Sequence, residues 1–85
     1  MEIRIQPSEY FMSDPFTITV PYTDTLENML YAITLTLSNH QVQEMDLFYK
    51  GRKLGPMNAK LNTFGLSHGE TVELKKAKSY CCVLI

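Results

Sequence analysis

Residues 16–37 of this chain, FTITVPYTDTLENMLYAITLTL, decide its fold. Apolar and polar side chains alternate over residues 16–20, and a period of two is typical of a half-buried strand. In the second half the apolar residues recur at spacings of three and four, which predicts a helix with one stripe facing a core. That stripe consists of Leu26, Met29, Leu30, Ile33 and Leu37.

The start of this helix has two candidate N-caps. Asp24 is followed three residues later by Glu27, an arrangement in which the two side chains satisfy N–H groups reciprocally as a capping box. Thr25 competes for the same role, because a threonine hydroxyl also accepts from the first turn. We expect the helix to end at Ser38-Asn39-His40.

Further strands are expected on both sides of this segment. Alternation predicts strands at residues 2–6, 45–49 and 71–75, with a short strand at Leu54 after a turn at residues 50–53. The order is strand, strand, helix, strand, short strand, strand. We therefore predict an α+β roll, in which a mixed sheet of four to five strands packs on one helix.

The inward positions of these elements supply enough apolar side chains for one core. Residues 7–15, rich in Pro, Ser and Asp, are expected to form a loop outside it. The expected core consists of Ile3, Ile5, Phe16, Ile18, Val20, Leu26, Met29, Leu30, Ile33, Leu47, Tyr49, Leu54, Leu61, Leu66, Val72 and Leu74.

Length and composition restrict the class of protein. Eighty-five residues make one domain, which we place at residues 1–76 with a tail at 77–85. A net charge of −1 argues against nucleic-acid binding. The two cysteines are adjacent, and His40 and His68 show no ligand spacing, so we expect no disulfide, no metal and no cofactor. We find no signal peptide and no apolar stretch of transmembrane length.

The last four residues, Cys82-Val83-Leu84-Ile85, match a prenylation box. A prenyltransferase would attach a thioether lipid to Cys82, and the aliphatic last residue favours geranylgeranyl. Cys81 is a candidate for palmitoylation, and Lys75, Lys76 and Lys78 are expected to contact anionic headgroups. The alternative is that this end is an apolar strand in which Cys82 is a small hydrophobic residue.

The chain resembles ubiquitin over about residues 1–76. Residues 16–20 and 24–29 resemble ubiquitin's second strand and helix start, residues 46–54 its third strand and following turn, and residues 61–74 its closing segment. The resemblance implies a ubiquitin-like β-grasp fold.

Two departures from ubiquitin bear on function. Conjugated modifiers end in Gly-Gly, whereas this chain has no glycine after Gly69. Ubiquitin's apolar recognition patch corresponds here to residues 9–11, Phe48 and Lys75, so a charge replaces a valine. The resemblance therefore implies neither conjugation nor strong binding by proteins that recognise ubiquitin's patch.

With its terminal box, the chain is similar to the membrane-anchored ubiquitin-fold proteins. This resemblance implies a prenylated, non-enzymatic adaptor on the cytoplasmic side of the plasma membrane, with a ubiquitin-conjugating enzyme as its partner. We expect a monomer whose partner binds the outward sheet face at Phe48, Arg4, Gln6 and Lys50.

Two other functions stay open. A soluble ubiquitin-like protein-binding module would need no lipid, and a conjugated modifier would need a Gly-Gly end that is missing. An enzyme is not expected, because no base lies beside Cys81 or Cys82 in the sequence.

Overall fold

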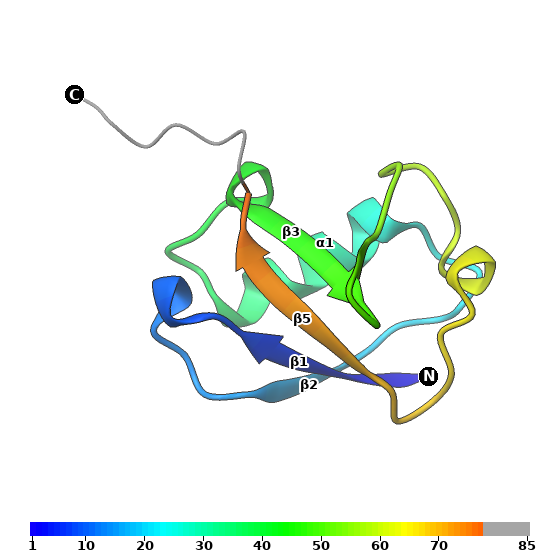
Figure 1. Ribbon diagram of the computed structural model, residues 1–85, viewed down its shortest axis with the longest axis horizontal. Helices are drawn as coiled ribbons and strands as arrows, with labels where there is room; N and C mark the ends of the chain where they lie inside the picture. The colour runs from blue at the N-terminus through cyan, green and yellow to red at the C-terminus, as the bar shows by residue number, and fades with distance from the viewer. Residues whose placement is uncertain (78–85) are drawn as a thin grey trace.

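The computed structural model describes residues 1–77. Five strands form one sheet in the order β2-β1-β5-β3-β4, in which β1 and β5 are parallel and the other neighbours antiparallel. The one α-helix of the described residues crosses behind this sheet (Figure 1). The elements are β1 (Glu2–Pro7), β2 (Phe16–Thr19), α1 (Leu26–Thr36), β3 (Met45–Tyr49), β4 (Arg52–Lys53) and β5 (Thr71–Lys76). This is the ubiquitin-like β-grasp fold, so the prediction of a mixed sheet on one helix is confirmed.

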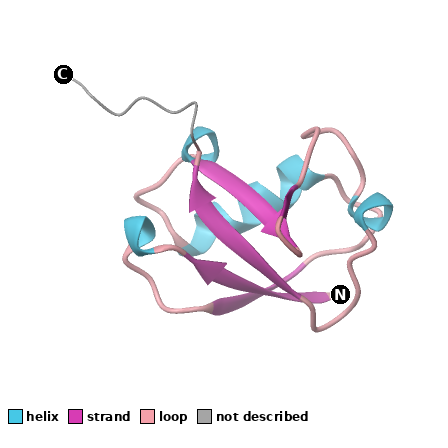
Figure 2. Ribbon diagram, in the orientation of Figure 1, coloured by secondary structure: helices cyan, strands magenta, loops and turns pink. Residues whose placement is uncertain are grey.

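Residues 1–77 also include three short turns of 3-10 helix, which lie at the periphery of the sheet (Figure 2). They are η1 (Glu9–Phe11), η2 (Val42–Glu44) and η3 (Leu61–Phe64). The sequence pattern predicted none of them, because a 3-10 turn is too short to show an apolar period.

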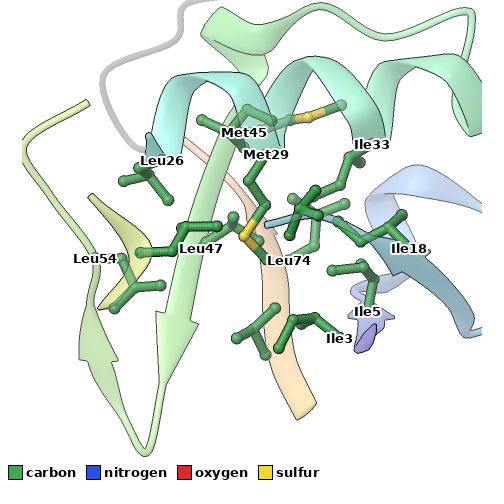
Figure 3. Close-up of a cluster of buried hydrophobic side chains, with 14 of the residues drawn as sticks. Ile3, Ile5, Ile18, Leu26, Met29, Ile33, Met45, Leu47, Leu54 and Leu74 are labelled. Carbon is green, nitrogen blue, oxygen red and sulfur yellow. The ribbon is translucent and has the colours of Figure 1, made fainter. Parts of the chain in front are cut away.

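The core lies between the sheet and α1, and Figure 3 shows the side chains from both layers meeting there. Alternation along β1 and β5 turns Ile3, Ile5, Val72 and Leu74 inward, and all four are buried. The predicted stripe of α1 packs against them. Burial of this apolar surface is the main force that holds the two layers together.

The core differs from the prediction at three aromatic positions. Phe11 lies in the segment that we expected to be a loop, yet η1 turns its ring inward and leaves it 3% exposed. Phe16 and Tyr49 were expected inside but are only partly buried, each packed against the edge of the core. An additional aromatic ring from the loop thus completes the core.

The helix begins with Thr25 as its N-cap, which decides between the two candidates. Thr25 Oγ1 accepts a hydrogen bond from the N–H of Asn28 at 3.2 Å. Asp24 supports this cap from one residue earlier, since its Oδ1 accepts from the N–H of Thr25 at 3.1 Å and from Nδ2 of Asn28 at 2.6 Å. The capping box with Asp24 as N-cap was therefore wrong by one residue.

The hairpin between β3 and β4 turns over Lys50 and Gly51. Both have positive φ, 52° and 80°, as the tightest two-residue hairpin turn requires. The following short strand is Arg52–Lys53, so the prediction of a strand at Leu54 was wrong. The N–H of Leu54 nevertheless donates to the carbonyl of Leu47 at 2.8 Å, and the Leu54 side chain is buried in the core.

Candidate protein-binding face

The face of the sheet turned away from α1 is polar except at one position. It is formed by every second residue of each strand, because side chains alternate along a strand. These residues are Glu2, Arg4, Gln6, Thr17, Thr19, Asp46, Phe48, Lys53, Thr71, Glu73 and Lys75, and we call them the sheet face. Phe48 is the single large apolar side chain among them.

Phe48 is half-buried by charged neighbours on both adjoining strands. In the register of the sheet it lies opposite Glu73 on β5 and Lys53 on β4. Lys75, two residues along β5, places its Nζ 4.8 Å from the centroid of the Phe48 ring, a cation–π distance. The ring is therefore partly covered by an ammonium group, which differs from an open apolar patch.

Two of the predicted partner-binding residues share this face with Phe48. Gln6 is paired with Glu73, so Gln6, Glu73 and Phe48 form one row across three strands. Arg4 lies one row away, paired with Thr71 and Thr17, and is exposed. The structure thus brings Phe48, Gln6 and Arg4 onto one continuous surface.

Lys50 is placed differently. It lies in the hairpin turn, and its Nζ is 5.3 Å from the centroid of the Tyr49 ring, on the other side of the strand from Phe48. The hydroxyl of Tyr49 donates in turn to the carboxylate of Glu70, and this hydrogen bond raises the pKa of Tyr49. Lys50 therefore borders the sheet face at its end.

Charges of both signs surround Phe48. Nζ of Lys53 lies 3.5 Å from Oδ2 of Asp46, an ion pair in which the lysine is largely exposed and the aspartate is not. Glu73 and Lys75 add one charge of each sign on β5. A partner for this surface needs its own charges in a complementary pattern around an apolar contact.

The lysines expected at a membrane do not form one patch. Lys75 points to the sheet face, whereas Lys76 points to the side that α1 covers and places its Nζ 5.4 Å from the centroid of the Tyr10 ring. Their separation follows from strand alternation. Lys78, Cys81 and Cys82 lie outside the described residues.

A polar cluster that sequence reasoning missed lies where β5 ends. Glu44 is 7% exposed, and its Oε1 accepts from the hydroxyl of Tyr10 at 2.7 Å and lies 3.0 Å from Nδ1 of His40. Its Oε2 accepts from the N–H of Gln41 at 2.8 Å. The carbonyl of Glu44 accepts from the N–H of Ala77 at 2.8 Å. The cluster thus joins η1, η2 and the end of β5.

Opposing effects act on the Glu44 carboxyl. Burial raises its pKa, but the hydrogen bonds from His40, Tyr10 and the Gln41 backbone lower it, and the net pKa lies below the ordinary value of 4.5. Glu44 is therefore a buried anion held by three donors. Gln41 and Glu44 have the three-residue spacing of a capping box, but Gln41 stands where such boxes usually have Ser or Thr, so the sequence signal was weak.

Residues 1–77 contain neither a metal-binding cluster nor a membrane-spanning helix. No three His, Cys, Asp or Glu side chains in this range lie close enough together to hold a metal ion. None of the helices described there has the length and apolar character needed to cross a bilayer.

Comparison with known proteins supports the fold. The chain is similar to the ubiquitin-like (UBL) domain of Plasmodium falciparum Dsk2, with a TM-score of 0.75 and 17% sequence identity over 91% of this chain and 97% of that one. No protein-family model matches the chain, and no curated protein matches it. The likeness establishes a ubiquitin-like domain by fold.

Proposed function

We propose that this protein is a ubiquitin-like adaptor without enzymatic activity, anchored to a membrane by lipid and binding a protein partner through its sheet face. Cys82 carries a prenyl group, with Val83-Leu84-Ile85 removed afterwards, and Cys81 carries a palmitoyl group. The membrane is the cytoplasmic face of the plasma membrane, and the partner is a ubiquitin-conjugating enzyme. Gathering the partner on a surface raises its effective concentration without new contacts.

The observation that carries the proposal is a prenylation box that follows a ubiquitin-like fold after a short connection. Ala77 is still held to the domain by its bond to Glu44, and only five residues later comes Cys82. One prenyl chain binds a bilayer weakly, so a second lipid at Cys81 or nearby basic residues are needed for stable anchoring. Lys76 and Lys78 supply that basic charge.

The partner surface is supported by the chemistry around Phe48. A single aromatic ring among complementary charges is typical of a hot spot with a polar rim. Arg4 and Gln6 lie on the same surface and can donate hydrogen bonds to a partner. Conjugation is not proposed, because the segment after Gly69 contains no glycine.

The anchor is tested by the intact mass of the protein isolated from its own cells. We expect a gain equal to a prenyl group, with loss of three residues, in the native chain and not in Cys82→Ser. Cys81→Ser is the matched control, and it should lose only an acyl mass. An unmodified mass ending at Ile85 would overturn the anchor and leave a soluble binding module.

The partner surface is tested separately by titrating the full chain with purified ubiquitin-conjugating enzymes and following backbone amide shifts. We expect amide shifts centred on Phe48, Gln6 and Arg4. Phe48→Ala should bind at least about tenfold more weakly, because truncation of an aromatic hot spot typically removes that much binding free energy. Thr36→Ala, an exposed position at the end of α1 and outside the sheet face, should bind normally. Shifts confined to other surfaces would contradict the assignment.

A further inference from the structure

The outer side of α1 carries almost no charge. From residue 28 to residue 43 the chain contains no Asp, Glu, Lys or Arg, and this stretch includes all of α1 after Glu27. A helix on the surface of a globular protein usually carries charged residues on its solvent side. The outer side of α1 is therefore chemically unlike the sheet face, which carries charges of both signs.

Apolar side chains occupy this uncharged surface. Tyr31 and Leu35 are 54% and 85% exposed, and their spacing of four residues places them on one side of the helix, opposite its buried stripe. Glu27 and Asn28 continue this side of the helix in its first turn, and Glu27 is its one charged residue. We call Glu27, Asn28, Tyr31 and Leu35 the outer helix face.

We propose that the outer helix face lies against the phospholipid surface, so that the sheet face points away from the membrane towards the partner. This inference rests on the lipid anchor of the proposed function. The inference specifies how the domain is oriented on the membrane. In this orientation Tyr31 and Leu35 contact the lipid.

The short connection to the anchor keeps the domain at the membrane. Five residues from Ala77 to Cys82 span at most about 18 Å when fully extended. The C-terminal end of α1 meets the same corner, because the N–H of His40 donates to the carbonyl of Leu37 at 3.0 Å and the His40 ring contacts Glu44. Ala77 is bonded to that same Glu44. A lipid on Cys82 thus holds the end of α1 close to the headgroups.

The charges decide which face turns to the lipid. The sheet face carries three carboxylates and three cations, all of which would lose water against lipid: Glu2, Asp46, Glu73, Arg4, Lys53 and Lys75. The outer helix face carries only one ion, Glu27, at the end of α1 away from the anchor, and it presents a leucine and a tyrosine, side chains that suit the boundary between headgroups and acyl chains. Lys76 lies on the helix side of the sheet, where it adds attraction to anionic lipid.

The test uses the absence of tryptophan from the sequence, so that one introduced tryptophan is a unique fluorescent reporter. Full-length Leu35→Trp is prenylated on Cys82 by a purified prenyltransferase and mixed with vesicles of phosphatidylcholine and phosphatidylserine. We expect a blue-shifted emission that brominated phosphatidylcholine quenches. Thr17→Trp, on the sheet face, should keep a solvent-like emission although the protein is bound.

A second measurement compares vesicle affinity. Leu35→Glu should bind about tenfold more weakly than the native lipidated chain, because it removes apolar burial and adds a charge facing an anionic surface. Thr17→Glu adds the same charge on the opposite face and should change affinity less than twofold. Equal losses in both variants, or an unquenched Leu35→Trp on bound protein, would overturn the orientation while leaving the anchor in place.

The remaining outcomes separate the two proposals. If the prenyltransferase does not modify Cys82, the anchor of the proposed function fails. A prenyl group attached chemically to Cys82 in a Cys81→Ser chain then still tests the helix face. A blue shift of Leu35→Trp that needs no vesicles and grows with protein concentration would overturn lipid contact in favour of a second copy of the chain.

Discussion

The hydroxyl of Tyr10 donates a 2.7 Å hydrogen bond to Oε1 of Glu44, across 34 positions of the sequence. It connects η1, which follows β1, with η2, which precedes β3. Since the Glu44 carbonyl also accepts from Ala77, the bond stabilises the corner from which the chain leaves the domain. The pair is a long-range contact that neither helix nor strand periodicity encodes.

Removal of this hydrogen bond should destabilise the domain. Tyr10→Phe keeps the ring but leaves the Glu44 carboxylate with one donor fewer, at an expected cost of about 1–2 kcal/mol in the free energy of unfolding. Urea denaturation followed by circular dichroism measures it. Tyr22→Phe, an exposed tyrosine on another loop, should change stability by less than about 0.5 kcal/mol. An equal effect from both substitutions would contradict the assigned role.

Acid should weaken the same corner. The pKa of Glu44 is lower in the folded chain than its ordinary value of 4.5, so the folded state favours the carboxylate. The stabilisation is fully present above pH 4.5 and is lost as the pH falls through the lowered pKa. Glu44→Gln should therefore be less stable than the native chain at neutral pH, and the difference should shrink in acid.

Unfolding free energies measured at several values of pH check this. The matched control is Glu27→Gln, whose carboxylate lies exposed in the first turn of α1. We expect the difference in unfolding free energy between the native chain and Glu44→Gln to shrink in acid by more than the difference between the native chain and Glu27→Gln. If Glu44→Gln lowered the unfolding free energy by the same amount at every pH, the charge of the Glu44 carboxylate would not contribute to stability.

Much of the fold could be predicted because its strands and helix have strong periods. The alternation of Ile3 and Ile5 and the three-four spacing from Leu26 to Ile33 each choose one buried side, and these sides meet in the observed core. Phe11 could not be predicted in this way. It belongs to a single 3-10 turn, and its burial is decided by the open edge of a core that other segments build.

The sheet face was predictable to the same extent as the strands that carry it. Alternation alone places Phe48, Arg4 and Gln6 on the outward side, as the structure has them. The side chain that covers Phe48 was not predictable, because it depends on the register between β3 and β5, which brings Lys75 over the ring. The register of two strands depends on how their buried sides match each other, so neither strand alone reveals it.

The β3–β4 turn should respond in opposite directions to two substitutions. Gly51 has φ of 80°, and a Cβ there would meet no atom within 4 Å, so Gly51→Ala should cost about 1 kcal/mol through backbone strain alone. Lys50→Asn should stabilise by up to about 0.5 kcal/mol, because asparagine tolerates positive φ better than lysine and Asn-Gly suits this turn. Thermal unfolding of both variants measures the effects, and a stabilising Gly51→Ala would contradict the turn geometry.

Lys75 should keep partners that recognise ubiquitin's apolar patch from binding this chain. Lys75→Val removes the ammonium 4.8 Å from the Phe48 ring and places an apolar side chain beside it. We expect this variant to bind a ubiquitin-binding domain about tenfold more tightly than the native chain, since burying a valine gains roughly that much. Titration calorimetry with one such domain gives both dissociation constants.

The matched control for that gain is Lys76→Val. It removes the same charge from the neighbouring position, but Lys76 points towards Tyr10 on the helix side of the sheet. If net charge alone governed binding, the two variants would gain equally, and the role of the sheet face would be refuted. A gain limited to Lys75→Val, and abolished again in the double variant with Phe48→Ala, would show that the ring and the residue beside it act as one surface.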